Sequence, residues 1–291
     1  MKNTLLLTLC TAIWGLGFAA TRWTLHDYSP LWSNALRFLF AGVVSLFLLM
    51  ITKKSKLSHY KGVLICSLLL FAAMATQTVG IAHTTLAKSG FLTALYAIFT
   101  PLFLIFQGRR IALRYWLKLL LAMFGIALMC ELKIDNLNQG DLFIIISAVF
   151  FSGHILAIEK YAKHEKALTF NLWQCIFIGL IGLIITAALE PLPSLRPLIA
   201  FDNPTYFITI VGFIILVFFS SIIAFGIQVS VQQKIKPHLV SLIFLTESVF
   251  AAFFGYVFFD ESLSFMGQVG AVLILMSVFL ISRLNKKSLV D

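Results

Sequence analysis

Apolar runs of membrane-spanning length follow one another along almost the whole of this sequence. A transmembrane helix needs about twenty predominantly apolar residues, and ten such segments occur here, separated mostly by short polar loops. They lie at residues 4–23, 31–51, 62–83, 87–107, 112–131, 140–161, 168–189, 205–232, 238–259 and 263–283. Because 60% of the residues are hydrophobic and only 12% are charged, a water-soluble globule is excluded. The sequence predicts an all-α integral membrane protein with ten transmembrane helices.

Lysine and arginine residues are distributed unequally between the two sides that these spans define. Cytoplasmic loops retain Lys and Arg. With the N-terminus inside, 17 of the 22 basic residues fall on the cytoplasmic side and 4 on the other, while Arg37 lies within a span. This bias predicts a multi-pass protein of the bacterial inner membrane with both termini cytoplasmic. It also accounts for the net charge of +10 without a nucleic-acid partner, because the basic residues form short clusters between apolar runs.

The chain is predicted to contain two copies of a five-span unit, at residues 1–136 and 137–291. Residues 14–18 (WGLGF) align with residues 150–154 (FFSGH), which brings the first span onto the sixth. The same alignment pairs positions of the second and seventh spans with a shift of one residue: Asn34, Arg37 and Gly42 with Asn171, Gln174 and Gly179. Because five is odd, the copies insert in opposite orientations, as in the inverted repeats of many secondary transporters. A substrate site near the bilayer midplane, between the halves, follows.

The fourth span, residues 87–107, carries its hydroxyl groups in one line. They belong to Ser89, Thr93, Tyr96 and Thr100, which are spaced i, i+4, i+7 and i+11 and share one helix face. Pro101 follows directly and frees the carbonyl of Ala97, which in hydrocarbon must be satisfied by protein or by water. Two interpretations remain open. The hydroxyls bond to their own backbone in a kinked span, or this face lines a substrate path with Pro101 as a gating kink.

Two charged residues lie inside predicted spans. Glu247 is near the middle of the ninth span, where a free carboxylate costs several kcal/mol, so it is protonated, paired or facing a water-filled cavity. It either couples protons, contacts a substrate amine, or forms a hydrogen bond across a helix interface. Arg37 lies about two turns inside the outer end of the second span. Snorkelling to the interface or a fixed ion pair is favoured there over binding a substrate carboxylate.

Other polar and aromatic positions are candidates for the substrate path. Gln228 and Gln232, one turn apart in the eighth span, either bridge helices or bind a zwitterion. His154 in the sixth span is an interface histidine or a proton relay. Trp14 and Phe18, one turn apart in the first span, either wall a cavity for an apolar substrate or pack in the core. The remaining candidates are Gln77 and Ser248.

Motifs for catalysis or cofactor binding are missing. The patterns HExxH, GxSxG and GxxxxGK[ST] do not occur. The cysteines, at positions 10, 66, 130 and 175, lie singly in different apolar runs, which argues against a metal site or a disulfide framework. Asp260 and Glu261 lie at a membrane edge, where we expect them to be solvated or to cap the start of the tenth span. We predict no cofactor, no metal and no enzymatic activity.

A specific pattern extends from the third span into the fourth, in the segment QTVGIAHTTLAKSGFLTALYAIFTPL of residues 77–102. Together with residues 224–232 and 245–263, it resembles the drug/metabolite transporter superfamily in its ten-span EamA branch, and the resemblance covers nearly the whole chain. The matching positions of the first segment are Gln77, Gly80, Thr84, Thr85, Gly90, Phe91, Leu92, Thr93, Leu95, Tyr96 and Pro101.

This sequence departs from the family pattern in two places. Family members usually carry Glu-Pro in the middle of the ninth span, whereas this chain has Glu247-Ser248, so the second half is expected to lack the kink that Pro101 supplies to the first. An acidic residue ends the ninth span as Glu261, but the matching end of the fourth span reads QGRR at residues 107–110. Both departures weaken any argument from symmetry.

The resemblance implies efflux of amino acids or related metabolites by alternating access. The candidate residues add that hydroxyls, carboxamides, one Glu and aromatics suit an amphipathic zwitterion better than a phosphorylated anion, which recruits basic groups. Three alternatives stay open: an uptake or exchange carrier for a cofactor-like metabolite such as S-adenosylmethionine, contacted by Glu247; an intramembrane enzyme using Glu247 with His154; and a passive channel. The expected partners are a small-molecule substrate and the lipid bilayer, and the protein is expected to be a monomer or a homodimer.

Overall fold

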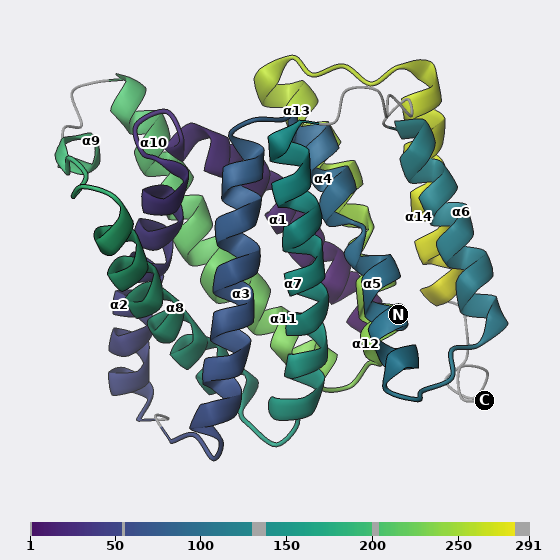
Figure 1. Ribbon diagram of the computed structural model, residues 1–291, viewed down its shortest axis with the longest axis horizontal. Helices are drawn as coiled ribbons and strands as arrows, with labels where there is room; N and C mark the ends of the chain where they lie inside the picture. Colours follow the sequence, from purple (N-terminus) through teal and green to yellow (C-terminus); the bar gives the residue numbers. More distant parts are fainter. Residues whose placement is uncertain (1, 54–55, 130–137, 200–203, 283–291) are drawn as a thin grey trace.

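The computed structural model describes residues 2–53, 56–129, 138–199 and 204–282, whose regular secondary structure is entirely helical (Figure 1). The helices are α1 (Lys2–Thr24), α2 (Pro30–Thr52), α3 (Tyr60–Ile81), α4 (Leu86–Thr93), α5 (Tyr96–Phe106), α6 (Leu113–Met129), α7 (Gln139–Tyr161), α8 (Ala167–Leu189), α9 (Arg196–Ile199), α10 (Pro204–Ile214), the π-helix η2 (Ile215–Ala224), α11 (Phe225–Gln232), α12 (Pro237–Phe244), α13 (Thr246–Phe259) and α14 (Phe265–Ser282). Cys130, Lys133 and the basic residues from 283 onward lie outside the described residues.

Within these described ranges, eight helical segments are long and apolar enough to cross a membrane. They correspond to eight of the predicted spans, and the prediction of an all-α membrane protein is confirmed. The predicted spans 112–131 and 263–283 correspond to α6 and α14, whose described parts are shorter. These two helices lie side by side at one end of the bundle, at the right in Figure 1.

The fourth and ninth spans are each broken into two helices. The fourth span breaks between α4 and α5, and the ninth breaks at Leu245, between α12 and α13. The sequence predicts no kink in the ninth span because it lacks a proline, yet the helix is interrupted at Leu245. The hydroxyls of Thr246 and Ser248 donate to the carbonyls of Ile243 and Leu245, at 2.9 and 2.7 Å. Such bonds to carbonyls one turn back bend helices without any proline.

In the fourth span, the carbonyl of Ala97 that Pro101 frees is satisfied by protein. The phenol of Tyr115, on α6, donates a hydrogen bond to it at 2.9 Å. The break itself precedes the proline by more than a turn, because α4 ends at Thr93 and α5 begins at Tyr96. The two broken spans therefore place both breaks deep in the bundle, where irregular backbone is tolerated only if protein or a cavity satisfies it.

Glycines allow the tightest helix contacts in the bundle, as is usual where membrane helices approach closely. At Gly179 of α8, an added Cβ would lie 2.5 Å from the carbonyl oxygen of Phe38 on α2. At Gly270 of α14, it would lie 2.1 Å from the carbonyl oxygen of Gly125 on α6. In both contacts the backbone of one helix touches the backbone of the other. Rotation of a side chain therefore cannot make room for an added Cβ.

Replacing Gly270 by alanine is therefore expected to separate α14 from α6. Overpacking of this kind costs about 1–3 kcal/mol, and more where only backbone can move. We expect a loss of monodisperse protein on size-exclusion chromatography in detergent and a lower unfolding temperature. Gly267→Ala is the matched control in the same helix, since its Cβ would meet the Leu263 side chain at 3.3 Å. Equal behaviour of the two variants would contradict the proposed contact.

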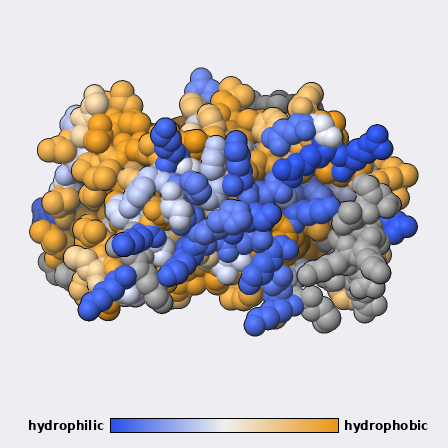
Figure 2. Space-filling view, turned by 90° about the horizontal axis from the view of Figure 1, so that it is seen from below, coloured by the Kyte–Doolittle hydropathy of each residue, from blue (hydrophilic) through white to orange (hydrophobic). Residues whose placement is uncertain are grey.

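Basic side chains gather at one end of the bundle. Figure 2, seen from below, shows hydrophilic residues across the middle of this face, with apolar residues around them. The loops that end here are those between α2 and α3, α5 and α6, α7 and α8, and α11 and α12 (Figure 1). The exposed basic residues of these loops and of the helix ends beside them include Lys56, Lys61, Arg109, Arg110, Lys160, Lys163, Lys166, Lys234 and Lys236. We call this end of the molecule the basic face.

Candidate substrate-binding site

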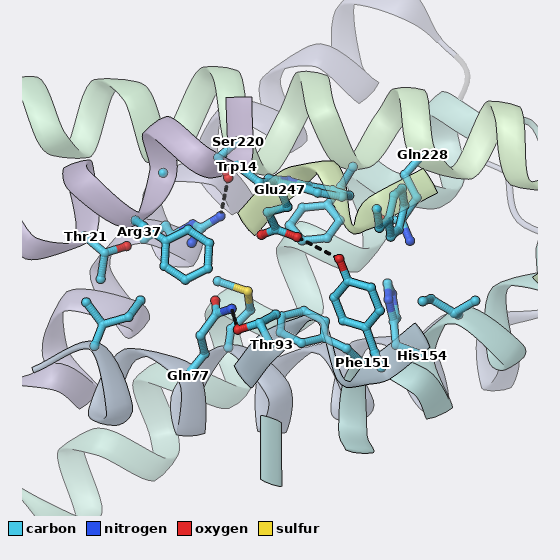
Figure 3. Close-up of a pocket in the computed structure, with 18 residues that line it drawn as sticks. Trp14, Thr21, Arg37, Gln77, Thr93, Phe151, His154, Ser220, Gln228 and Glu247 are labelled. Carbon is cyan, nitrogen blue, oxygen red and sulfur yellow. Dashed lines mark hydrogen bonds between the residues drawn. The ribbon is translucent and has the colours of Figure 1, made fainter. Parts of the chain in front are cut away.

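A cavity of about 40 Å³ lies inside the bundle, between helices of both halves of the chain (Figure 3). This volume holds about three water molecules, so a larger ligand requires the surrounding side chains to move apart. The lining residues are Trp14, Gly17, Phe18, Thr21, Arg37, Met74, Gln77, Ile81, Thr93, Tyr96, Phe151, His154, Ile155, Ser220, Phe225, Gln228, Phe244 and Glu247. The cavity is thus mostly apolar, with a few polar groups and two charged ones.

Most of the path residues named from the sequence meet at this cavity. Those that line it are Trp14, Phe18, Gln77, Thr93, Tyr96, His154, Gln228 and Glu247. The others, which do not line it, are Ser89, Thr100, Gln232 and Ser248. The sequence does not indicate how far each side chain lies from the cavity, so all twelve residues are predicted as one group. The tertiary structure separates an inner set from groups that lie behind it.

The predicted hydroxyl stripe of the fourth span is only partly directed at the cavity. Thr93 and Tyr96 line it, with the Thr93 hydroxyl accepting a hydrogen bond from Gln77 Nε2 at 3.0 Å. Ser89 and Thr100 are buried away from the cavity. The stripe assumes one continuous helix, and the break between α4 and α5 interrupts its register after Thr93.

Gln232 and Ser248 form hydrogen bonds with neighbouring protein groups instead. Gln228 Nε2 donates to Gln232 Oε1 at 3.1 Å, and Gln232 Nε2 donates to the carbonyl of Ile155 at 2.5 Å. Gln232 therefore holds Gln228 in place from behind. The Ser248 hydroxyl is used in the backbone contact at the break of the ninth span.

The two helix breaks bring Glu247 and Tyr96 together. Tyr96 is the first residue of α5 and Glu247 the second of α13, and the Tyr96 hydroxyl donates to Glu247 Oε2 at 3.1 Å. Figure 3 shows this hydrogen bond inside the cavity. Because Glu247 is in the first turn of α13, its carboxyl also lies where the helix dipole favours negative charge.

Arg37 extends from α2 into the same cavity, contrary to the favoured expectation from the sequence. It is 3% exposed, so it does not snorkel to the interface. Its Nε donates to Ser221 Oγ at 2.9 Å and its Nη2 to Ser220 Oγ at 2.7 Å. Arg37 forms no ion pair within the part of the chain that the structure describes. Both serines lie in the π-helix η2, and such irregular turns are frequent at functional sites.

Aromatic rings form the apolar walls of the cavity. The Trp14 ring lies 5.0 Å from those of both Phe225 and Phe244, and the Tyr96 ring lies 6.5 Å from that of Phe151. These phenylalanines are not among the candidates predicted from the sequence. With 29 Phe in the chain, no local pattern distinguishes them from core or lipid-facing rings.

Three lining residues carry buried polar atoms without a hydrogen-bond partner among the described residues. These atoms are Trp14 Nε1, His154 Nδ1 and Gln228 Oε1. The other ring nitrogen of His154 is 3.2 Å from Gln174 Oε1, so this histidine is only half satisfied. Buried polar groups are nearly always paired, so such atoms indicate a place for water or a ligand.

Ion pairs join the two halves at both ends of the bundle. At the end opposite the basic face, Arg22 Nη1 lies 2.9 Å from Glu261 Oε1. Glu261 also accepts hydrogen bonds from the amides of Leu86 and Ala87. It therefore caps α4, and the expectation that it is solvated or caps the tenth span is wrong. A hollow at this end is lined by Arg22 and shares Ile81 with the central cavity.

At the basic face, another ion pair crosses between the halves. Arg109 Nη1 lies 2.8 Å from both carboxylate oxygens of Glu159. Arg109 is in the α5–α6 loop and Glu159 is near the end of α7. The departure from the family pattern at residues 107–110 thus supplies the basic partner of this pair.

Membrane-length helices around a central cavity with a few polar groups, and with a broken helix from each half beside it, are the arrangement of secondary transporters. Comparison with known proteins identifies the particular kind. The profile of the EamA-like transporter family matches residues 1–130 and 138–283, and the chain belongs to this family.

Two relatives and one solved structure are similar over most of their length. An uncharacterized transporter of Archaeoglobus fulgidus is 27% identical over 285 residues, which are 95% of this chain and 84% of the relative. The uncharacterized transporter YoaV of Bacillus subtilis is 24% identical over 280 residues, 93% of each chain. A crystal structure with 17% sequence identity superposes with a TM-score of 0.76, covering 100% of this chain and 99% of its own. The last likeness shows the fold alone.

Proposed function

We propose that this protein exports amino acids or related small amphipathic metabolites across the bacterial inner membrane, by alternating access of two inverted five-helix halves. The observation that carries the proposal is the central cavity, in which Arg37 and Glu247 lie among aromatic rings and unpaired polar atoms. Such a site suits a molecule with both charged and apolar parts. Ten spans and cytoplasmic termini belong to the same proposal.

The helix contacts support the relation between the halves. α2 packs on α8 and α6 on α14, so the second and fifth spans of each half meet their own counterparts. α3 packs on α7, while α1 packs on α10, η2 and α11, which form the eighth span. The third span of each half therefore meets the first span of the other. These contacts are unchanged when the halves are exchanged, as an inverted repeat requires.

The ion pairs at the two ends suit alternating access. Arg22 and Glu261 fasten the halves at one end, where Lys88 and Asp141 form a further ion pair, and Arg109 and Glu159 fasten them at the basic face. Opening either end to admit or release a substrate breaks the ion pairs of that end while those of the other end hold. The Arg109–Glu159 pair is the most exposed of the three, so we expect it to be the weakest.

Purified protein reconstituted into liposomes tests the proposal. Vesicles loaded with a mixture of the twenty amino acids are diluted into buffer with trace radiolabelled amino acids, and uptake is followed as counterflow. We expect counterflow of at least one apolar amino acid, and comparison of medium metabolites between cells that overexpress and cells that lack the protein should show the same compound. Equal leakage without internal substrate would indicate a passive channel. No transport of any amino acid in either assay would refute the proposal.

A cofactor-like cation is the second candidate, because a carboxyl group and several aromatic rings share the cavity. Glu247 would contact the charge, and the rings of Trp14, Phe225 and Phe244 are suitable for cation–π contact. S-Adenosylmethionine included in the counterflow assay distinguishes this alternative. Saturable exchange of S-adenosylmethionine, without amino-acid exchange, would favour it.

A further inference from the structure

Arg37 is a buried cation that the described part of the protein leaves without a counter-charge. Its only hydrogen-bond partners there are the neutral hydroxyls of Ser220 and Ser221. A charged side chain inside the membrane usually pairs with another charge or faces a water-filled cavity. An unpaired buried charge is costly, so an anion that enters this cavity gains a strong interaction.

The two serines also determine which part of the guanidinium group a ligand can use. They engage Nε and Nη2, while Nη1 makes no hydrogen bond within the described residues. The two serines therefore hold the planar guanidinium group by the edge that carries Nε and Nη2. Arginine held in this way presents its remaining N–H groups in a fixed geometry that suits a carboxylate.

The second charge of the cavity lies apart from the first. Glu247 is hydrogen-bonded to Tyr96 at 3.1 Å and does not form an ion pair with Arg37. Figure 3 shows both side chains directed into the cavity, with Arg37 beside Ser220. The cavity therefore has a basic subsite at Arg37 and an acidic subsite at Glu247. A doubly charged phosphate group would be repelled by Glu247, whereas a zwitterion complements both.

We infer that Arg37 binds the carboxylate of the transported molecule and so determines that the substrate is an α-amino acid or a similar zwitterion. Its ammonium group faces Glu247, and its side chain lies among the aromatic rings. This inference rests on the proposed function and adds the residue that selects the substrate.

Counterflow competition in proteoliposomes tests the inference on the wild-type protein first. The labelled probe is the amino acid that the protein exchanges best, and the competitors are the unlabelled amino acid, its methyl ester and its decarboxylated amine. We expect only the free carboxylate form to compete strongly. A methyl ester that competes as well as the amino acid would overturn the role of Arg37, whereas absence of exchange for every amino acid would refute the proposed function as well.

Variants then test the residue itself. Arg37→Gln is expected to weaken the apparent affinity for the amino acid by about tenfold to a hundredfold, the usual effect of losing a hydrogen bond to a charged group. The weak competition by the amine should not change, and Arg37→Lys should recover part of the affinity. Arg110→Gln is the matched control, since Arg110 is exposed at the basic face. Unchanged affinity in a folded Arg37→Gln protein would overturn the inference, and if that variant does not fold, the methyl ester arm decides.

Discussion

Glu247→Gln is expected to abolish the dependence of transport on the pH gradient while leaving exchange of substrate intact. A glutamine keeps the size of the side chain and its capacity to accept a hydrogen bond from Tyr96, but it cannot take up or release a proton. If Glu247 carries the coupling proton, wild-type vesicles accumulate substrate against its gradient when a pH difference is imposed. The variant should reach only the level seen without a pH difference. Counterflow, which needs no proton movement, should persist with lower affinity.

Glu159→Gln is the matched control for this experiment. It makes the same chemical change at a carboxylate that lies outside the cavity, at the basic face. It should keep the response to the pH gradient. If the Glu247→Gln protein retains normal pH-driven accumulation, Glu247 has no part in coupling and its role is limited to substrate contact or helix packing.

Glu261→Ala is expected to open the end of the protein opposite the basic face. The carboxylate pairs with Arg22 and accepts from the amides of Leu86 and Ala87, so one substitution removes the ion pair and two hydrogen bonds to the first turn of α4. Asp260, in the left-handed conformation at φ 54°, turns the chain so that Glu261 reaches this position. Losing such partly buried hydrogen bonds costs about 1–3 kcal/mol, or about a fivefold to hundredfold shift between closed and open forms.

The shift can be measured with a cysteine at Thr21, which lines the cavity on α1. In a background without the native cysteines, Thr21→Cys should react slowly with a membrane-impermeant thiol reagent added from outside. Adding Glu261→Ala should raise the reaction rate by about tenfold or more. Arg109→Ala, which breaks the ion pair at the basic face, should not raise it. An unchanged rate in the folded Glu261→Ala protein would show that this pair does not close the end opposite the basic face.

The ninth span shows why the family pattern does not predict every helix break. This span has no proline, yet its helix is interrupted. The sequence predicts a kink only at Pro101. Both observed breaks instead lie at small or hydroxyl-bearing residues, where side-chain contacts satisfy the backbone. Thr246 and Ser248 replace amide hydrogen bonds at one break, and Tyr115 satisfies Ala97 near the other. Serine and threonine are common in apolar segments, so their presence alone could not locate a break.

Arg37 shows the same limit for a single side chain. Its depth in the span was evident, but its partners come from η2, more than 180 residues away in sequence. No feature of the sequence around residue 37 indicates that two consecutive serines of η2 face α2. Snorkelling was therefore the natural expectation, and only the packing of η2 against α2 shows that the side chain turns inward.

The sequence by itself determined the all-helical membrane fold, the basic side of the molecule and the family, because long apolar runs, loop charges and a contiguous motif are local properties of the chain. It also identified most of the polar groups of the cavity, since a polar residue inside an apolar run is conspicuous. Only the tertiary structure decided which of them meet. The relative depth of Ser89 and Thr93, the pairing of Tyr96 with Glu247, and the separation of Glu247 from Arg37 depend on how broken helices pack, and this packing depends on contacts between residues far apart in the chain.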